Sequence, residues 1–564
     1  MTGRGFRIGS GLVAAGVILG GAEIVAAFIS PDATPFQAVG AWVIDHTPDG
    51  LREWAIDTFG TNDKLVLFVL MGVVAVLLAA VAGLIERPKR PAGSVLFGIL
   101  GLLSAVAAVT RPHATWNWLF PSILGAWAGI MVLRTLIDRI ADLEDVSAAA
   151  GGTGAAGGSG AGAGSSGPAD HDLDAGAAGD SATSPGTAAV QRDATGGRTA
   201  RTASTDDVAL ERRLVVRGIA VAAVAGIGAG IAGRVLEVRS RSVAGERAEV
   251  VLPTPKGVPV AVDPAADLKL PGLTPYLTPN SDFYRIDTAL TVPQLSRENW
   301  SLRIHGMVDR EIRLSWADLD ARTPVERLVT LACVSNPVGG DLIGNAQWLG
   351  YRLDELIAEA GPHPDADMVL SRSVDGFTAG SPLAALTDGR DALLAVGMNG
   401  EPLPTAHGYP ARLVVPGLYG YVSATKWVTE LEITRFDRAQ AYWTKRGWSA
   451  EGPIKTGTRI DTPRGGTRAP GVVTVAGVAW AQHRGIRGVE VRVDNGEWQP
   501  ARLAAEPSID TWRQWAFDWQ AEPGVHTLWA RATDGTGETQ TADRRDVIPD
   551  GASGYPSVTI RVNA

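Results

Sequence analysis

The stretch Leu331-Ala-Cys-Val-Ser-Asn-Pro-Val-Gly-Gly-Asp-Leu-Ile-Gly-Asn-Ala-Gln-Trp348 contains Cys333, the single cysteine of the chain. An apolar run at Arg327–Ala332 leads into it and is expected to form a strand. The glycine, asparagine and proline residues after the cysteine are typical of a loop with a special backbone path. A lone cysteine is often no more than a small buried apolar residue. A strand that ends in such a loop, however, is a frequent location for a functional site.

The composition excludes several classes of protein. One cysteine rules out an intramolecular disulfide framework, a multi-cysteine zinc site and a cysteine-ligated iron–sulfur cluster. The net charge is −9, so the chain has no overall basic field, and a nucleic-acid binder is not expected. Only 20% of residues are charged, 45% are hydrophobic, and the mean hydropathy is +0.08. These values indicate that part of the chain lies in lipid.

Around Cys333 the sequence predicts a mixed α+β domain over residues 251–460. Short alternating apolar runs indicate strands, and two segments have the pattern of short helices. Strands are expected at Trp300–Gly306, Glu311–Leu314, Arg327–Ala332, Ala411–Val415 and Lys426–Thr434, and helices at Trp316–Asp320 and Arg352–Ala360.

Residues 461–564 have almost no helical periodicity. The turn Asp494-Asn495-Gly496 between alternating runs is a strong hairpin signal. We therefore expect an immunoglobulin-like antiparallel β-sandwich, an architectural label only, since the cysteine pair of antibody domains is missing. Its strands are expected at Val472–Trp480, Val489–Val493, Gln514–Trp519, His526–Ala532 and Ser557–Val562.

The amino-terminal part contains apolar stretches of membrane-spanning length. We expect four transmembrane helices in residues 1–145, a flexible linker rich in Gly, Ala and Ser over 146–205, and a fifth transmembrane helix within 206–250. The apolar stretches are Gly9–Ile29, Leu65–Ile85, Ser94–Thr110, Leu119–Ile137 and Leu214–Gly233.

The basic residues predict the orientation of these helices, because Lys and Arg are retained on the cytoplasmic side. Arg4 and Arg7 place the amino terminus inside, and five crossings leave the part after Gly233 outside. We expect a multi-pass protein of the plasma membrane with an extracytoplasmic outer half. The pair Arg212-Arg213 before the fifth stretch is either part of this charge pattern or an internal twin-arginine export signal.

From about Leu270 to Val562, the chain resembles the sulfite oxidase family of molybdenum–molybdopterin enzymes. The similarity is carried by four segments in this order. They are Thr278-Pro-Asn-Ser-Asp-Phe-Tyr-Arg285, the Cys333 loop, Gly397-Met-Asn-Gly-Glu-Pro-Leu-Pro404, and His407-Gly-Tyr-Pro-Ala-Arg-Leu-Val-Val-Pro-Gly417 with Lys426-Trp427.

The resemblance implies a molybdenum–molybdopterin cofactor with one Mo per chain, whose metal ligand from the protein is the thiolate of Cys333. A thiolate is a soft ligand that the metal itself deprotonates, so the cysteine needs no neighbouring base. The resemblance also implies phosphate contacts from charged side chains. The implied cofactor-binding residues are Asn280, Phe283, Tyr284, Cys333, His407, Arg412, Ser423 and Lys426.

By the same resemblance, Arg285 faces an anionic substrate and is catalytic together with Cys333; the alternative for Arg285 is an ordinary surface ion pair. Two departures from sulfite oxidases bear on the substrate. Phe377 stands where those enzymes have an active-site tyrosine, which removes a hydroxyl. Val338, Gly339 and Gly340 replace arginines of the cysteine loop. We therefore expect a less cationic pocket, which puts sulfite itself in doubt.

The expected function is oxygen-atom transfer coupled to two electrons on a small-molecule substrate. Alternatives are an S-oxide or N-oxide reductase on the same fold, or a surface binding module without cofactor. Haem is not expected, because the sequence lacks C-x-x-C-H and no histidine lies within a predicted span. Electrons then require a separate electron-transfer protein or quinone-linked partner. Membrane lipid is the other expected partner, and homodimer formation stays open.

Overall fold

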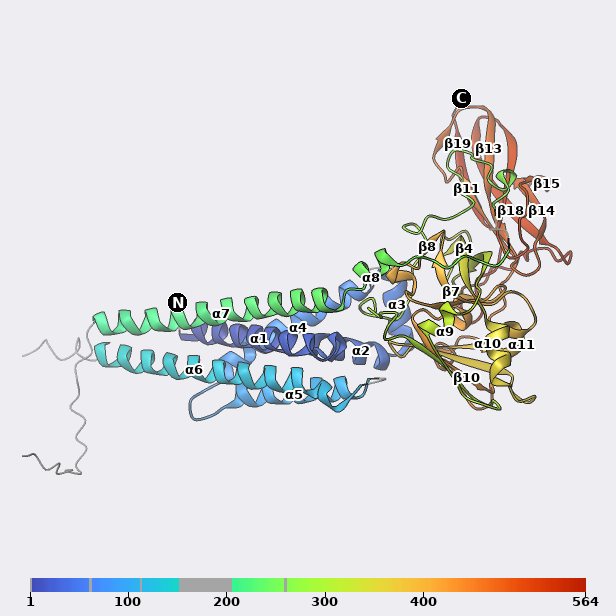
Figure 1. Ribbon diagram of the computed structural model, residues 1–564. Coiled ribbons are helices and arrows are strands. Elements are labelled where there is room, and N and C mark those ends of the chain that lie inside the picture. Colours follow the sequence, from blue (N-terminus) through green and yellow to red (C-terminus); the bar gives the residue numbers. More distant parts are fainter. Residues whose placement is uncertain (1–2, 60–62, 112–113, 152–204, 258–260, 564) are drawn as a thin grey trace, which may run out of the picture. The chain divides into compact units, whose positions relative to one another are not determined.

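The computed structural model describes residues 3–59, 63–111, 114–151, 205–257 and 261–563 (Figure 1). The chain forms two compact units. The first unit consists of Met1–Phe36, Leu67–Val106 and Asn117–Arg234, and the second of Gln37–Val66, Ala107–Trp116 and Val235–Ala564. Most of the expected linker over 146–205 lies outside the described residues.

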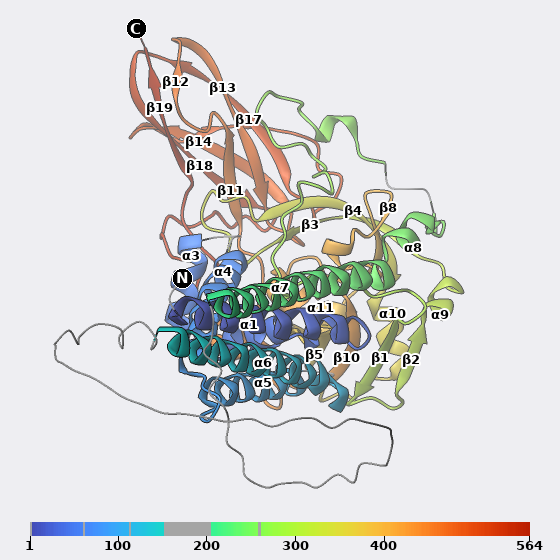
Figure 2. The same cartoon turned by 90° about the vertical axis from the view of Figure 1, so that its left-hand side faces the viewer.

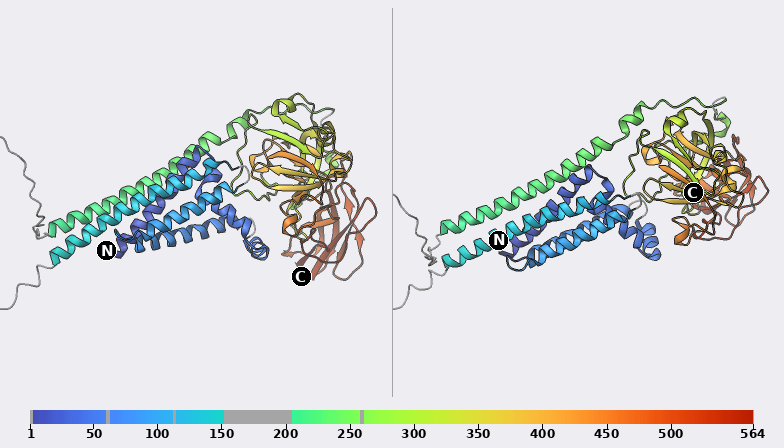
Figure 3. Two further views of the ribbon diagram at one scale, coloured as in Figure 1. Left: turned by 90° about the horizontal axis from the view of Figure 1, so that it is seen from below. Right: turned by 60° about the horizontal axis from the view of Figure 1, so that its bottom comes forward.

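Long apolar helices dominate the first unit (Figure 3). Among the described residues, five helices are long and apolar enough to cross a membrane: α1 (Gly3–Ala27), α4 (Asp63–Ile85), α5 (Ala92–Val109), α6 (Phe120–Gly151) and α7 (Thr205–Arg241). The apolar stretches expected from the sequence fall largely within them. Glycines let their backbones touch: a methyl group at Gly11 of α1 would lie 2.0 Å from the carbonyl oxygen of Ala79 in α4.

The segment between α1 and α4 contains two further helices. They are α2 (Pro35–His46) and α3 (Asp49–Phe59). Pro35 is the first residue of α2, a position where proline is tolerated because that N–H has no intrahelical partner. Most of this segment belongs to the second unit.

The middle of the second unit is an α+β domain with two sheets. One sheet has the order β2-β1-β10-β5-β6, and the other has β3-β4-β7-β8 with β9 paired to β7. The strands are β1 (Ser301–Gly306), β2 (Ile312–Ser315), β3 (Val325–Ala332), β4 (Ile343–Arg352), β5 (Met368–Ser373), β6 (Thr378–Pro382), β7 (Leu393–Met398), β8 (Glu401–Pro402), β9 (Arg412–Val414) and β10 (Val428–Thr434). The helices are α8 (Ala244–Glu249), α9 (Trp316–Asp320), α10 (Leu353–Ala360), α11 (Leu383–Thr387) and α12 (Gly420–Ser423).

The strands and helices predicted around Cys333 are confirmed, with ends shifted by at most two residues. β4 was not predicted, although it pairs with β3 along eight residues on the far side of the cysteine loop. Its sequence contains Gly344 and Gly350, and glycine weakens the sequence signal of a strand. Other atoms lie close to both glycines: a methyl group on Gly350 would lie 2.4 Å from the Leu394 carbonyl oxygen. Glycine therefore allows β4 and β7 to pack closely.

The carboxyl-terminal part consists of two sheets that share one apolar core (Figure 2). Their orders are β11-β13-β17-β16 and β12-β19-β18-β14-β15. The strands are β11 (Gly457–Thr462), β12 (Thr467–Arg468), β13 (Gly471–Trp480), β14 (Ile486–Val493), β15 (Gln499–Pro500), β16 (Arg502–Leu503), β17 (Arg513–Ala521), β18 (Gly524–Asp534) and β19 (Ser557–Val562). Trp515 from the first sheet and Leu528 from the second are fully buried in this core. β11 begins at Gly457, so this part starts before the expected boundary at residue 461.

Candidate active site

A pocket with about 850 Å³ of empty space, part of it open to solvent, lies in the α+β domain. Cys333 is on its wall, and so are Arg412 and Lys426, which are far from the cysteine in sequence. Aromatic side chains make up much of the remaining wall. They are Phe283, Tyr284, Phe377, Tyr421, Trp427, Trp443 and Trp448.

Cys333 directly follows β3 and is 8% exposed. Its loop is closed by the Cys333 N–H, which donates to the Leu342 carbonyl at 2.9 Å, and by Asn336 Oδ1, which accepts from the Leu342 N–H at 3.0 Å. The turn needs glycine at position 340, because a methyl group there would lie 2.4 Å from Asn336 Oδ1. Burial raises the pKa of the thiol, while hydrogen bonds from Ser335 lower it in part.

Strand β11 of the carboxyl-terminal part contacts the cysteine loop. Arg459 of β11 donates to the Gly340 carbonyl at 3.2 Å and pairs with Asp461 at 2.6 Å. The side chains of Arg459 and Asp461 are 5% and 0% exposed. A buried ion pair of this kind costs desolvation unless every group is satisfied, so it fixes geometry more than it adds stability.

Arg412 begins β9 and is a buried cation with no anionic partner. Its guanidinium lies 5.1 Å from the centre of the Trp348 ring and donates only to backbone carbonyls, at 3.2–3.4 Å. No ion pair joins it to a carboxylate in the part of the chain that the structure describes. Burial lowers the pKa of Arg412 to about 10. An unpaired buried charge is costly, so this arrangement favours an anionic ligand.

Lys426 lies just before β10 and is 9% exposed. Its Nζ donates to Asp287 Oδ2 at 2.8 Å. Burial lowers the pKa of Lys426 to about 8, although Asp287 acts in the opposite direction. The next residue, Trp427, is buried and has φ of 51°, in the left-handed region. Such a conformation costs roughly 1–3 kcal/mol and is concentrated at functional sites.

His407 joins the pocket to the segment around Asn280. Its Nε2 donates to the Asn280 carbonyl at 3.2 Å, and its ring meets the edge of Phe283 at a centroid distance of 5.7 Å. Burial, together with the charges of Arg412 and Lys426, lowers the pKa of His407 to about 4. The imidazole is therefore neutral at physiological pH.

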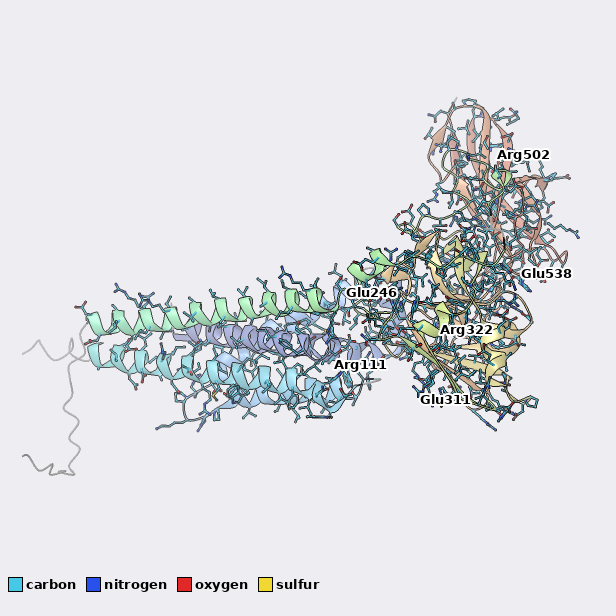
Figure 4. The ribbon with its side chains drawn as sticks, viewed as in Figure 1. Arg111, Glu246, Glu311, Arg322, Arg502 and Glu538 are labelled. Carbon is cyan, nitrogen blue, oxygen red and sulfur yellow. The ribbon has the colours of Figure 1, made fainter. Side chains whose placement is uncertain are left out.

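Helix α8 holds the chain between His407 and Arg412 in place. Glu246 of α8, labelled in Figure 4, accepts a hydrogen bond from the hydroxyl of Tyr409 at 2.6 Å. The same carboxylate accepts from the Arg297 N–H at 2.9 Å. Burial and Glu246 together raise the pKa of Tyr409, so this phenol stays protonated as a donor.

Six of the nine residues expected at the site line this pocket: Phe283, Tyr284, Cys333, His407, Arg412 and Lys426. The other three lie near it without lining it. Asn280 contacts the pocket-lining His407, whose Nε2 donates to the Asn280 carbonyl. Ser423 is fully buried at the end of α12, where its hydroxyl donates to the carbonyls of Leu418 and Tyr419. Arg285 is 39% exposed and donates from Nε to Asp287 at 2.7 Å.

Several lining residues were not predicted, and Asp287 is the most consequential. The pattern Arg285-Ile-Asp287 contained a usable signal, because residues two apart in an extended chain point to the same side. Burial alone would raise the pKa of Asp287, but Lys426, Arg285 and Lys64 outweigh it and hold that pKa well below its usual range. Trp443 and Trp448 lie in an irregular loop, where no periodicity marks a side chain as facing a pocket.

Comparison with known proteins agrees with this site. The family profile described as "Oxidoreductase molybdopterin binding domain" matches residues 289–443, which include Cys333, Arg412 and Lys426. The fold and the pocket thus belong to the molybdopterin-binding oxidoreductases.

The relatives are more specific. The chain is 28% identical to chicken sulfite oxidase over 299 residues, which cover 44% of this chain and 64% of that protein. It is 32% identical to the uncharacterized oxidoreductase YuiH of Bacillus subtilis over 153 residues, which cover 27% of this chain and 74% of YuiH. The sulfane dehydrogenase SoxCD structure from Paracoccus pantotrophus matches 56% of this chain and 95% of its own at 22% identity, with a TM-score of 0.45. The chain belongs to the sulfite oxidase family of molybdopterin oxidoreductases.

The residues present fit the cofactor of this family. The pocket presents one buried thiol, a buried arginine without an anionic partner and a buried lysine, which together suit a metal and a phosphate group. The hydroxyl of Ser373, on the same wall, is buried and has no hydrogen-bond partner among the described residues. Buried polar groups are normally satisfied, so this oxygen is available to a ligand.

Proposed function

We propose that this protein is a membrane-anchored molybdenum–molybdopterin oxidoreductase that transfers an oxygen atom and two electrons at an extracytoplasmic site. The observation that carries the proposal is that one pocket contains both the buried Cys333 thiol and Arg412, a buried cation that pairs with no carboxylate among the described residues. When bound, the cofactor supplies the two-electron redox centre and accepts or donates the oxygen atom. The chain matches between about half and two thirds of the length of curated sulfite oxidases, so the whole activity is part of this proposal.

The residues divide the work by chemistry. Cys333 would hold the metal as a thiolate, since a bound metal favours the deprotonated form that burial disfavours. Arg412 and Lys426 would bind the pterin phosphate by charge-assisted hydrogen bonds. His407, neutral and fixed by the Asn280 carbonyl, adds an aromatic ring without charge to the pocket. Phe283 and Tyr284 stack on each other at 5.3 Å and close one wall.

The charge balance of the pocket favours a substrate that is not strongly anionic. Asp287 is paired with both Lys426 and Arg285, so it offsets the charges of these two cations. Phe377 and Trp443 provide apolar surface on the same wall. These features support the second candidate function, an S-oxide or N-oxide reductase, in which two electrons and two protons convert the substrate oxygen to water.

The membrane part supports the location. Five helices have the length and composition of membrane spans, and the basic residues at their ends follow the positive-inside pattern. We place the pocket outside the cytoplasm. Folded export of a cofactor-loaded domain then favours the twin-arginine interpretation of Arg212-Arg213. A separate electron-transfer protein or a membrane quinone exchanges the electrons.

The test is molybdenum and pterin analysis of the purified protein from a host that synthesises the cofactor, together with the variants Cys333→Ser and Ser301→Ala, the latter at an exposed position of β1. We expect about one molybdenum and one pterin per chain in the wild type, loss of molybdenum in Cys333→Ser, and retention in Ser301→Ala. Wild-type protein without either component would overturn the proposal. Protease accessibility in right-side-out vesicles tests the location of the pocket independently.

A further inference from the structure

The second unit contains a contact that the function above does not use. Lys64 is the second residue of α4, one of the helices of membrane-spanning length, and belongs with Gln37–Val66 to the second unit. Its Nζ donates to the carbonyl of Asp287 at 2.8 Å, to Asp287 Oδ1 at 3.2 Å and to the carbonyl of Ala289 at 2.7 Å. The ammonium group is therefore directed at residues 287–289, through two backbone carbonyls and one carboxylate oxygen.

This stretch contains Asp287, a carboxylate that lines the pocket. The side chain of Asp287 is 5% exposed and lies between three cations. One of its oxygens accepts from Lys426 at 2.8 Å and from Arg285 at 2.7 Å, and the other accepts from Lys64. Residues 287–289 have no helix or strand of their own to hold them. The ammonium of Lys64 supplies the missing hydrogen bonds, because it satisfies two of the carbonyls and the carboxylate at once.

A second contact brings the same segment to the pocket. Asp45 of α2 lies 3.8 Å from Arg446, and the Arg446 guanidinium stacks 3.6 Å from the centre of the Tyr442 ring. Tyr442 meets Phe377 at 5.8 Å and Trp443 at 5.1 Å, and both of those residues line the pocket. The segment Gln37–Val66 is thus connected to pocket-lining residues at two places, directly through Lys64 and Asp287 and indirectly through Asp45, Arg446 and Tyr442.

We propose that Lys64 is a positioning residue of this active site: by holding the Asp287–Ala289 backbone and the Asp287 carboxylate, it fixes where Lys426 and Arg285 present their charges. The start of α4 is then part of the catalytic apparatus and not only an anchor. This inference rests on the function proposed above, because its consequence is the placement of Lys426 in the pocket and of Arg285 beside it.

The contact itself is tested without turnover. It is measured by thermal unfolding of the detergent-solubilised full chain without cofactor. Lys64→Met should lower the midpoint of unfolding, because two backbone carbonyls and the Asp287 carboxylate lose their shared donor, and it should lower the midpoint by less in the Asp287→Asn background. The control is Lys89→Met, which changes an exposed lysine just beyond the other end of α4 and should leave the midpoint unchanged.

The positioning role is tested by a double-mutant cycle on the molybdenum-loaded full chain. We expect Lys64→Met to lower kcat/KM roughly tenfold when Asp287 is present and by a smaller factor in the Asp287→Asn background, because the part of the effect that passes through the carboxylate is then lost while the hydrogen bonds to the carbonyls of residue 287 and Ala289 remain. Lys64→Arg, which keeps the charge and donors, should restore most of the activity. Lys89→Met should stay at the wild-type value.

The outcomes separate this inference from the proposed function. No loss of kcat/KM for Lys64→Met in either background would overturn the positioning role while the enzyme assignment stands, and equal factors in both backgrounds would overturn the part that passes through the carboxylate. If the wild type holds no molybdenum, the proposed function fails, and thermal unfolding alone decides whether Lys64 holds Asp287. An unchanged midpoint in Lys64→Met would then overturn the inference as well.

Discussion

Asp287 Oδ2 lies 2.8 Å from Nζ of Lys426, and the two side chains are only 5% and 9% exposed. The buried Asp287 carboxylate thus forms an ion pair with the lysine that the family resemblance assigns to the pterin phosphate. The same carboxylate holds Arg285, the residue assigned to an anionic substrate. Asp287 therefore determines how much positive charge the pocket offers to either group.

Replacing Asp287 by Asn should make the pocket more attractive to anions. The side chain keeps its shape, but Lys426 and Arg285 lose their shared counter-charge. We expect the KM for a small oxyanion, oxidised with a ferricyanide acceptor, to fall roughly fivefold, a change of about 1 kcal/mol. The KM for an uncharged sulfoxide, reduced with a viologen donor, should change by less than half as much. An equal shift for both substrates would contradict the role given to Asp287.

Arg285→Ala should act on charged substrates alone. Removal of the guanidinium should raise the KM for the oxyanion roughly tenfold and leave the KM for the sulfoxide within about twofold, since only the anion gains from it. Arg303→Ala is the matched control, because Arg303 forms an exposed ion pair with Glu311 on the first sheet. Steady-state kinetics on both substrates separate the two cases. A rise in KM for the neutral substrate would show a general effect on the fold.

The part of the site predicted from sequence depended on residues inside recognisable segments. Cys333, Arg412 and Lys426 were placed together by the family resemblance, and the pocket contains all three. Spacing alone could not have joined them, because 79 residues separate Cys333 from Arg412 and the sheet pairing of β9 with β7 brings them to one side. Physical patterns predicted β1 and β10 well: β1 alternates buried residues with more exposed ones, and in β10 the apolar residues Leu431 and Ile433 alternate with charged ones.

The parts that were missed share a physical cause. Residues 287–289 and the loop with Trp443 and Trp448 are irregular, so their side chains have no period from which a direction follows. The contact from Lys64 joins residues 223 positions apart through hydrogen bonds to backbone carbonyls, which leave no trace in side-chain types. The periodicity of a sequence predicts which side chains face a core. It does not predict single hydrogen bonds between residues that are far apart in the chain.

Arg412→Met should separate cofactor binding from folding. Methionine fills a similar volume without charge, so the variant loses the cation that attracts the phosphate. We expect at least a tenfold loss of bound molybdenum and pterin. The cofactor-free protein should become more stable by roughly 1 kcal/mol, because a buried charge without a counter-ion is removed. Elemental analysis and thermal unfolding of the two apoproteins measure the two effects. A destabilised apoprotein would show that Arg412 is needed for the fold itself.

The neutral state of His407 predicts how the stability of the cofactor-free protein depends on pH. Burial and the neighbouring cations lower the pKa of His407 to about 4, whereas an unfolded histidine titrates near 6.5. Between these values the unfolded chain binds a proton that the folded chain does not bind. The free energy of unfolding should therefore fall as the pH drops from 6.5 toward 4, by at most about 3 kcal/mol from this group.

His407→Gln removes the titrating group and keeps a donor for the Asn280 carbonyl. Thermal unfolding of the detergent-solubilised apoprotein, followed by tryptophan fluorescence at several pH values, should show a shallower decline in this variant than in the wild type. His363→Gln is the control, since that imidazole is largely exposed and should leave the decline unchanged. Parallel declines in the wild type and His407→Gln would mean that the pKa of His407 in the folded protein is not lowered. The conclusion that this imidazole is neutral in the pocket would then be wrong.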